Sequence, residues 1–294
     1  MLSARAAGTI SSMALVGVIG WPQETNVALA AAWRDRGIPA DLVNPAVATC
    51  LLGPGDIAIG RLDVRRTLDG VELGLGVLSE LAYRGVRVLN HAKALLRAHD
   101  KLLTAAYLER AGVRHPHTVL LEPGAELPME PPFVLKPRFG SWGLDVFRCG
   151  TRSELELVLE VVADRPWFLH HGALLQELMP TVGHDLRLIV AGGRVVGSVR
   201  RIAAPGEWRT NTALGGLREP VERVPEEASR LALAAAAAIE TDLVGVDLLP
   251  VDGGFVVLEL NGAVEFDELY NLPGRDVYLD AARALAIEPA RVAA

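Results

Sequence analysis

Two apolar segments near the C-terminus, 244–251 and 255–260, have the composition of paired β-strands, but they contain or adjoin polar residues that a buried strand rarely accepts. These polar residues are Asp247, Glu259 and Asn261. The intervening sequence Asp-Gly-Gly is typical of a hairpin loop, and counting back from its flanks places Asp247 opposite Glu259. Asn261 lies two residues further along and therefore points to the same face as Glu259. The sequence predicts a hairpin that presents two carboxylates and an amide together.

Two facing carboxylates on such a hairpin repel each other, and burying a charge without a partner costs several kcal/mol. A bound cation would compensate them, and an oxygen-only set of ligands suits Mg²⁺ or Mn²⁺. Because Mg²⁺ usually takes one or two protein carboxylates and shares its other positions with water and substrate phosphates, the hairpin indicates a nucleotide site. The alternative is a solvated hairpin end, since Asp and Glu often lie on exposed strand faces.

Length, charge and cysteine content exclude several classes of protein. The chain has 294 residues, half of them apolar, which is enough for one large domain or two to three small ones. Its formal net charge of −7 gives no general footprint for nucleic acid or for an anionic membrane. Cys50 and Cys149 lie far apart, so neither a disulfide framework nor a Cys-X-X-Cys site is predicted, and the cytoplasm is the expected compartment. The apolar stretch 14–20 is too short to span a membrane.

The first hundred residues alternate between strand-like and helix-like segments, which is the pattern of an open α/β domain with a parallel sheet. The segments are 14–19, 26–36, 40–43, 57–59, 71–84 and 86–89. We expect this N-terminal domain to cover residues 14–95, after a disordered leader at 1–13. A helix at 101–111, begun by Asp100 and ended by Gly112, links it to the next unit.

Two further units of mixed α+β character are expected downstream. The central unit, 96–175, contains a proline-rich connector, short strands and one helix, at 122–132, 133–136, 145–149, 152–163 and, across its boundary, 174–178. The C-terminal unit, 176–294, contains two strands, a polar loop and a helix before the hairpin, at 185–190, 195–201, 205–216 and 226–240. The predicted fold class is therefore α/β combined with α+β.

A strand that ends in Lys136 leads into a loop with two glycines and a serine. The loop residues are Gly140, Ser141, Trp142 and Gly143. Glycines let backbone N–H groups approach phosphoryl oxygens, the serine adds a hydroxyl donor, and the lysine neutralises charge. The segment matches neither the Walker pattern nor Gly-X-Gly-X-X-Gly. A hairpin turn beside an exposed lysine is the alternative interpretation.

The next two polar segments suit a nucleotide base and its surroundings. An apolar strand ends in Gln176, Glu177, Leu178 and Met179, where backbone groups can bind a planar base and Leu178 and Met179 can supply apolar contact. Asp185 and Arg187 share one face of a later strand whose other positions are apolar. The alternatives are an ordinary strand end and an exposed sheet face with ion pairs.

Cationic residues then follow in two places. The strand after Arg187 ends in Arg200 and Arg201, and Arg209 and Asn211 lie in a loop that precedes two glycines. Such a loop can bring a guanidinium and an amide to a phosphate or a metal ion.

The order of these elements resembles the ATP-grasp carboxylate–amine ligases over nearly the whole chain. The segments that carry the resemblance are Asp100 and Lys101, then KPRFGSWG, QEL, HDLRLIV, VVGSVRR, EWRTNTALGG, GVDLLPV and VLELNGAVEF. The chain is most similar to RimK-type ligases, which add glutamate to protein C-termini, and especially to the LysX type of carrier-protein-dependent lysine biosynthesis. The Gly-Ser-Trp-Gly loop and the pair Glu265 and Phe266, four residues past Asn261, favour the LysX type.

The resemblance implies an ATP-grasp fold in which central and C-terminal lobes clamp ATP beside an N-terminal pre-ATP-grasp domain. It implies that Lys101 and Lys136 contact phosphate and base, that residues 176–178 form the adenine hinge, and that Asp185 lies near the ribose. Glycine-loop residues 140–143 would contact phosphate.

For the metal and the reacting groups, the resemblance implies that the polar hairpin holds two Mg²⁺ or Mn²⁺ ions through Asp247, Glu259 and Asn261. It also implies that cations face the phosphate or the acyl phosphate, with Asn211 nearby; these cations are Arg187, Arg200 and Arg209. Further candidates for contact with the substrate are Arg61, Glu265 and Phe266.

One position departs from the family pattern. Leu214 stands before the paired glycines, where members commonly have arginine. Either Arg209 or Arg218 replaces that cation, or the substrate lacks the anionic group that the arginine meets.

The implied reaction is attack of a carboxylate on the γ-phosphate of ATP, followed by attack of an amine on the acyl phosphate, which gives an amide, ADP and phosphate. The expected acid is a glutamate residue or an amino-acid-like acceptor, and the expected amine is an amino acid. Synthesis of a small-peptide natural product is an alternative, as are a non-catalytic ATP-binding scaffold, which Leu214 favours, and a carboxylate kinase that stops at the acyl phosphate.

The expected partners follow from the same resemblance. An acidic carrier protein or peptide would need a basic docking face, for which the candidates are Arg61, Arg65, Arg66, Arg84 and Arg87. No nucleic acid and no membrane is expected. The resemblance also implies a homo-oligomer, either a dimer or a tetramer.

Overall fold

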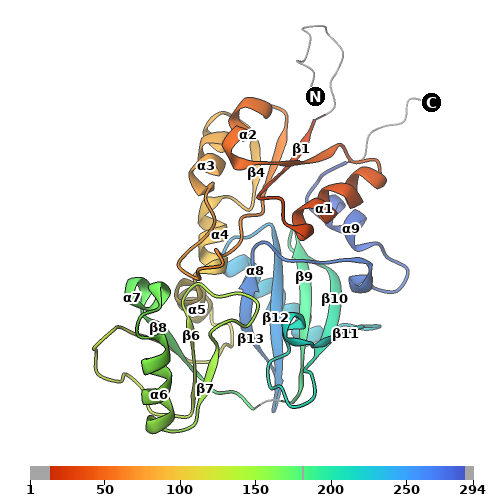
Figure 1. Ribbon diagram of the computed structural model, residues 1–294. Helices are drawn as coiled ribbons and strands as arrows, with labels where there is room; N and C mark the ends of the chain where they lie inside the picture. The colour runs from red at the N-terminus through yellow and green to blue at the C-terminus, as the bar shows by residue number, and fades with distance from the viewer. Residues whose placement is uncertain (1–13, 181, 289–294) are drawn as a thin grey trace, which may run out of the picture.

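The computed structural model describes residues 14–180 and 182–288, so the leader expected at 1–13 lies outside the described residues. The described chain forms three β-sheets, each in its own lobe (Figure 1). In Figure 1 the N-terminal lobe lies above the other two, which stand side by side. Among the described residues, no helix is both long enough and apolar enough to cross a bilayer.

The N-terminal lobe contains a parallel sheet in the order β2-β1-β3-β4, with helices on both faces. Its elements are β1 (Val16–Ile19), α1 (Glu24–Asp35), β2 (Ala40–Val43), α2 (Pro45–Leu51), β3 (Ile57–Gly60), α3 (Leu75–Tyr83), β4 (Arg87–Leu89) and α4 (Ala92–His99). Neighbouring residues of β3 face different cores, because Ala58 packs with α2 and α3 whereas Ile59 packs with α1. The open parallel α/β domain predicted from the sequence is therefore confirmed.

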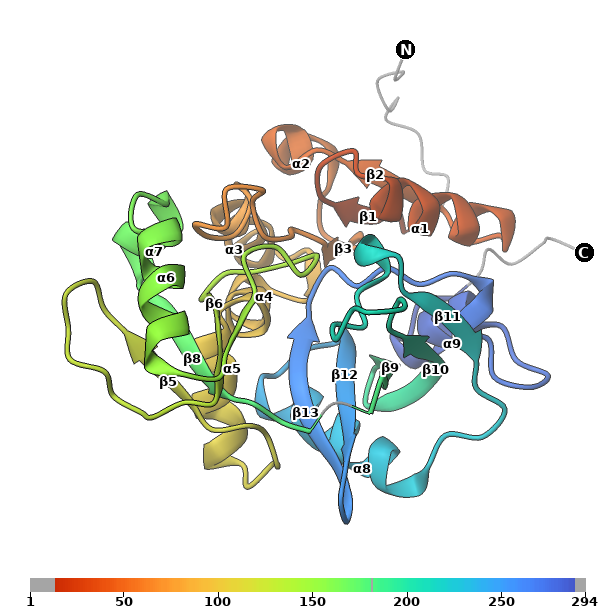
Figure 2. The same cartoon turned by 60° about the horizontal axis from the view of Figure 1, so that its bottom comes forward.

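The central lobe contains an antiparallel sheet in the order β5-β8-β6-β7. Its elements are α5 (Lys101–Arg110), β5 (Thr118–Leu121), β6 (Phe133–Pro137), β7 (Phe147–Cys149), α6 (Arg152–Val162), α7 (Pro166–His171) and β8 (Ala173–Glu177). Leu155 of α6 and Trp167 of α7 pack with Phe133 and Leu175 of the sheet, so both helices cover one face of it (Figure 2). Strand β8 continues to Glu177, so the boundary expected between residues 175 and 176 falls inside this strand.

The C-terminal lobe contains an antiparallel sheet in the order β11-β10-β9-β12-β13. Its elements are β9 (His184–Ala191), β10 (Arg194–Ile202), β11 (Leu217–Pro220), α8 (Glu226–Ala238), β12 (Leu243–Val251), β13 (Gly254–Asn261) and α9 (Val277–Ala284), with short 3₁₀ helices at Thr212–Leu214 and Glu268–Tyr270. Leu186 and Leu188 of β9 pack against α8, whereas Asp185 and Arg187 face the opposite side. Near the start of β9 that opposite side is polar and faces the central lobe, whereas further along it Ile189 and Ala191 pack in a core with α1 and α9.

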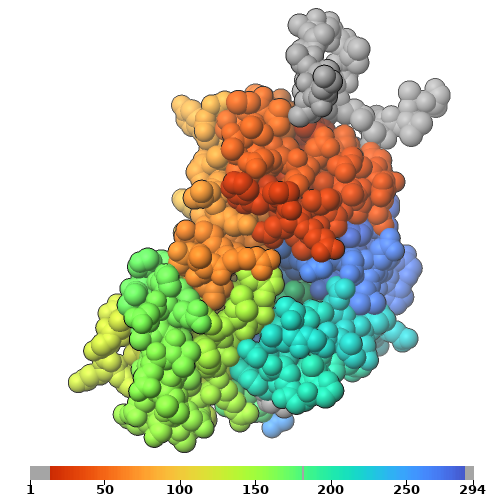
Figure 3. All heavy atoms as spheres, viewed as in Figure 1, coloured from red at the N-terminus to blue at the C-terminus, as the bar shows by residue number. Residues whose placement is uncertain are grey.

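Asn90 and the loop after β3 provide two of the contacts that hold the N-terminal lobe against the others. Asn90, which is fully buried, donates from Nδ2 to the carbonyl oxygens of Leu243 at 2.6 Å and Gly262 at 3.2 Å. Val64 and Leu68, in the loop after β3, pack in the core of the central lobe. The N-terminal lobe therefore forms a wall where the three lobes meet, as the space-filling view shows (Figure 3).

Candidate active site

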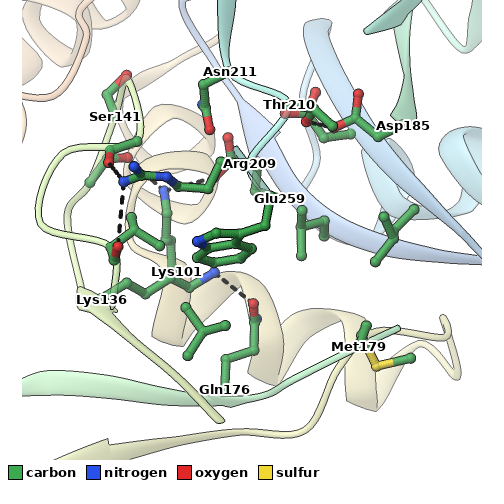
Figure 4. Close-up of a pocket in the computed structure, with 18 of the residues that line it drawn as sticks. Lys101, Lys136, Ser141, Gln176, Met179, Asp185, Arg209, Thr210, Asn211 and Glu259 are labelled. Carbon is green, nitrogen blue, oxygen red and sulfur yellow. Dashed lines mark hydrogen bonds and ion pairs between the residues drawn. The ribbon is translucent and has the colours of Figure 1, made fainter. Parts of the chain in front are cut away.

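A cleft between the central sheet and the C-terminal sheet is lined by side chains from both lobes (Figure 4). It brings together most of the predicted site residues, namely Lys101, Lys136, Gly140, Ser141, Trp142, Gly143, Gln176, Glu177, Leu178, Asp185, Arg209, Asn211, Asp247 and Glu259. A second cavity continues from it and adds Arg187, Asn261 and Glu265. Residues far apart in the sequence thus converge on one site.

Lys136 is a buried cation on the central-lobe side of the cleft. Its Nζ donates to Gln176 Oε1 at 2.7 Å, and Gln176 Nε2 donates in turn to Thr118 Oγ1 at 3.0 Å. Burial, and then the nearby charge of Lys101, lower the pKa of Lys136 to about 8. An amide oxygen is its only polar partner among the described residues, so the ammonium retains a need for an anion.

We expect the affinity of the protein for a non-hydrolysable ATP analogue to fall about 10-fold between pH 7.5 and pH 9, because phosphate binds the ammonium form of Lys136 and that form is lost as pH rises through about 8. Calorimetric titration over this range tests the expectation. Lys136→Met should bind weakly with little pH dependence, and the exposed Lys93→Met should behave as wild type. An unchanged pH dependence in Lys136→Met would remove Lys136 from the nucleotide site.

A loop of the C-terminal lobe packs over the glycine loop. Arg209 Nη1 donates to the carbonyl of Gly143 at 2.9 Å, and a Cβ at residue 143 would lie 3.0 Å from Asn211 Oδ1. Gly143 also has φ of +72°, so both its backbone conformation and this close approach require glycine. The arrangement leaves Ser141, Gly140 and the loop backbone along the cleft.

Leu214 contributes to the same closure. Its Cδ1 would lie 3.0 Å from a Cβ at residue 143, so the leucine packs beside the glycine loop. Neither proposed substitute for the family arginine is free, because Arg209 is paired with Glu207 at 2.7 Å and Arg218 with Asp267 at 2.9 Å.

The polar face of the C-terminal sheet carries a buried chain of ion pairs. Arg187 donates from Nε to Asp247 Oδ1 at 2.6 Å and from Nη2 to Oδ2 at 2.7 Å. Arg201 donates from Nη2 to Asp247 Oδ2 at 2.8 Å, and from Nε and Nη2 to Asp185 at 2.8 and 2.5 Å. Burial alone would raise the pKa of the Asp247 carboxyl, but the two guanidinium groups outweigh it and hold that pKa well below its ordinary value. The premise that Asp247 lacks a protein partner is therefore wrong.

Asp185 lines the cleft, and its carboxylate is bonded within the protein. Its side chain is fully buried, and it accepts bonds from Arg201 and, at 2.6 Å, from Thr210 Oγ1. The carboxylate thus anchors the loop that carries Arg209 and Asn211 to the sheet.

Asp247 and Glu259 are cross-strand partners in the hairpin, as predicted, and Asn261 follows on the same strand. Glu259 Oε2 lies 3.3 Å from Lys101 Nζ, and the same Nζ donates to the carbonyl of Gly140 at 2.7 Å. Asn261 Nδ2 is buried and has no hydrogen-bond partner among the described residues, although the side chain lines the second cavity. A buried N–H without a partner is unusual and suits a bound ligand or water at this position.

Arg200 is not in the site. Its side chain is about half exposed and pairs with Glu219, away from the cleft, whereas the adjacent Arg201 is buried within it. The prediction that Arg200 faces the phosphate is therefore corrected in favour of Arg201.

Of the three candidates for substrate contact, Arg61 and Phe266 line neither the cleft nor the second cavity. Arg61 is 1% exposed and donates from Nε to Asn26 Oδ1 at 3.2 Å, so it does not line either cavity. Phe266 is buried against Tyr278, with ring centroids 5.2 Å apart, and belongs to a hydrophobic core. Only Glu265 reaches the second cavity.

The structure adds residues for which no site role is predicted from the sequence. They are Arg201 and Thr210 in the cleft and Gln23, Thr25 and Asp63 in the second cavity. Arg201 and Thr210 each adjoin a predicted residue, Arg200 and Arg209 respectively. Gln23 and Asp63 lie in loops after β1 and β3, and Thr25 lies in the first turn of α1, at the end of a parallel sheet where ligands commonly bind.

Comparisons with known proteins identify relatives of this chain. The family model of the RimK-like ATP-grasp domain matches residues 98–285. A probable alpha-L-glutamate ligase from Pseudomonas paraeruginosa (strain DSM 24068 / PA7) is 32% identical over 211 residues, which are 69% of this chain and 68% of that protein. The solved structure of a RimK domain protein ATP-grasp from Sphaerobacter thermophilus DSM 20745 is 22% identical, with a TM-score of 0.63, and covers 92% of this chain and 98% of its own.

A further structure, that of the ATP-grasp ligase PsnB complexed with a minimal precursor, Mg and ADP, is 17% identical, with a TM-score of 0.64, and covers 96% of this chain and 99% of its own. These structures confirm the ATP-grasp fold. The sequence match extends through the central and C-terminal lobes that form the cleft. The chain therefore belongs to the RimK-like ATP-grasp family and is an ATP-dependent carboxylate–amine ligase.

Proposed function

We propose that this enzyme activates the carboxylate of a glutamate residue or a glutamate-like acid as an acyl phosphate and transfers the acyl group to the amine of an amino acid. The observation that carries the proposal is the convergence of Lys101, Lys136 and the glycine loop on one wall of the cleft with Glu259 and Asn261 on the other. The probable glutamate ligase activity of the relative that is 32% identical supports the choice of substrates.

The residues of the hairpin fit a Mg²⁺ ion. An ionised carboxylate has about four acceptor sites, and the arginines occupy three of those on Asp247, so one remains. Among the described residues Glu259 forms one ion pair, to Lys101, and Asn261 adds its amide oxygen beside an N–H that has no partner there. We propose that these three side chains hold one or two ions. When bound, Mg²⁺ would neutralise phosphate oxygens and polarise the transferred phosphoryl group.

The chain's own residues would then act by position and charge. Lys101 and Lys136 would bind the phosphates with the backbone of the glycine loop, and residues 176–178 would lie against the base. Arg187 and Arg201, fixed by their carboxylate partners, would stabilise negative charge on the reacting carboxylate. The loop anchored by Asp185 would close the cleft over them and exclude water.

The acceptor is proposed to be an amino acid or a short peptide. Arg61 of the expected basic face is buried, Arg65 and Arg84 each pair with an acidic neighbour, and Arg87 donates to backbone carbonyls near residue 285. Arg66 stacks over the ring of Trp142, so the five arginines do not form one continuous basic face for an acidic carrier protein. The similarity of 140–143 and 265–266 to LysX-type ligases supports an amino-acid-like acceptor within the same proposal. A homo-oligomer and a cytoplasmic location stay predictions.

The experiment that tests the proposal is a mass-spectrometric screen of acids and amines with the purified protein, ATP and Mg²⁺. L-Glutamate and glutamate-terminated peptides serve as acids and the common L-amino acids as amines. We expect an amide together with stoichiometric ADP and phosphate. AMP and pyrophosphate, or ADP release without any need for an amine, would contradict the proposed reaction.

A further inference from the structure

Trp142 of the glycine loop has a backbone conformation that bulky residues rarely adopt. Its φ is +57°, in the left-handed region, and the following Gly143 has φ of +72°. The side chain of Trp142 lines both the nucleotide cleft and the second cavity. The indole therefore lies where the two cavities meet, and a strained residue in such a place persists only where surrounding contacts hold it.

One of those contacts comes from the N-terminal lobe. Arg66 lies in a turn after β3, residues 64–71, and its guanidinium lies over the indole of Trp142, with Cζ 5.2 Å from the ring centroid. That distance is within the range of a cation–π interaction, and tryptophan is the aromatic residue that binds cations best. Asp69 of the same turn pairs with Arg65, at 3.3 Å, and no ion pair involves Arg66 among the residues that the structure describes. The guanidinium is therefore available to the ring.

The 64–71 turn is fixed against the central lobe, so Arg66 approaches the glycine loop from a rigid support. An antiparallel bridge between Val64 and Val71 closes the turn. Val64 and Leu68 are 2% and 4% exposed and pack in the core of the central lobe. Because Arg66 lies between these two buried residues, its backbone cannot move independently of that core.

The same turn also contacts the start of the glycine loop. The carbonyl oxygen of Asp69 lies 3.0 Å from His171 Nε2, and the ring of His171 packs edge-on against Phe139, with centroids 5.1 Å apart. Phe139 directly precedes Gly140 in the chain. The turn thus supports the beginning of the glycine loop through His171 and its tip through Arg66.

We propose that Arg66 is a positioning residue for ATP, because it holds Trp142, and through Trp142 the glycine loop, in the conformation that binds the phosphates. This inference rests on the role of the glycine loop in the function proposed above. Arg66 lines neither cavity, so it acts through the indole and not on a ligand. Nucleotide affinity would then depend on a residue of the N-terminal lobe, outside the two lobes that form the cleft.

A double-mutant cycle tests the proposal, with calorimetric titration of the full chain with AMPPNP and Mg²⁺ as the measurement. Arg66→Leu should weaken binding about 3-fold, which is the effect expected of an exposed cation–π contact. Trp142→Leu should weaken binding at least as much, and adding Arg66→Leu to it should have no further effect above about 1.5-fold. Arg66→Lys should retain the affinity of the wild type, because an ammonium also binds the ring.

The matched control is Arg84→Leu, which removes a half-exposed arginine of the same lobe outside both cavities and should bind as wild type. A loss from Arg66→Leu that is equally large with and without Trp142 would show that the guanidinium attracts phosphate at long range, and the proposal would be wrong. Wild-type affinity in Arg66→Leu, or a loss that Arg66→Lys shares, would also overturn it. Wild-type affinity in Trp142→Leu would contradict the role of the glycine loop itself.

Binding without turnover separates this inference from the proposed reaction. Coupling between Arg66 and Trp142 in the titration, with no amide in the substrate screen, would contradict the reaction alone. Amide formation without coupling would contradict this inference alone. Once the substrates are identified, Arg66→Leu should raise the KM for ATP about 3-fold with kcat unchanged, since Arg66 contacts neither the nucleotide nor the reacting atoms.

Discussion

Replacing Arg201 with methionine is expected to lower the free energy of unfolding by about 3–5 kcal/mol and to reduce ligase turnover at least about 100-fold. Methionine keeps most of the apolar stem, so the loss comes from the guanidinium. That group compensates Asp185 and Asp247, which are 0% and 1% exposed, and removing it leaves two carboxylates buried with one arginine between them. Urea denaturation and ADP release measure the two effects.

Arg200→Met is the matched control, because Arg200 is the preceding residue on the same strand. Its pair with Glu219 is nearly half exposed on both sides, and such pairs contribute about 0–1 kcal/mol. We expect little change in stability or turnover. Equal and small effects in both variants would show that the buried ion pairs do not organise the site. A large effect in Arg200→Met alone would support the prediction that Arg200 faces the phosphate.

A single-residue bulge in β10 decides which of the two adjacent arginines enters the site. The turn at Gly192 and Gly193 pairs Ala191 with Arg194, and counting from it without interruption places Arg200 opposite Asp185. The structure has a bulge between Val195 and Gly197, which shifts the register so that Arg201 faces Asp185 instead. Because a shift of one residue exchanges the two faces of a strand, the cation in the site changes with it.

The register of the polar hairpin also departs from the expected one, but here the predicted cross-strand pair is kept. The turn of β12 and β13 is one residue shorter than the sequence indicates, since Val251 pairs with Gly254, but a shift of register between Asp247 and Leu248 restores the pairing of Asp247 with Glu259. The prediction is confirmed because two deviations offset each other. The compensation of Asp247 could not be predicted, since its arginines lie on β9 and β10 and only the sheet order brings them close.

The remaining differences reflect tertiary packing that has no local signal. The sequence pattern does not predict six of the elements, namely α2, α4, β5, α7, β11 and α9. Phe266, which follows the polar Glu265, faces a core shared by the N-terminal and C-terminal lobes, and nothing in its own segment reveals that partner. By contrast, the long apolar strands and the order of the polar loops, which the sequence does show, determine the cleft.

Replacing Glu259 with glutamine is expected to reduce turnover by on the order of 100-fold or more, which corresponds to about 2.7 kcal/mol of lost transition-state stabilisation. Glutamine has the same size and keeps one acceptor oxygen, but it lacks the charge that a Mg²⁺ ligand supplies. The free energy of unfolding should change by less than about 1 kcal/mol, because the side chain is 20% exposed and forms one ion pair, to Lys101. A higher Mg²⁺ concentration should be needed for half-maximal activity.

ADP release measured over a range of Mg²⁺ concentrations, with urea denaturation of the same samples, separates a metal role for Glu259 from a structural one. The matched control is Glu219→Gln, which removes a carboxylate from the same sheet outside the cleft and should leave both curves unchanged. Loss of turnover together with several kcal/mol of stability would indicate that Glu259 mainly holds Lys101. Unchanged turnover and Mg²⁺ dependence would remove Glu259 from the metal site and leave the orphaned amide of Asn261 to be explained by phosphate alone.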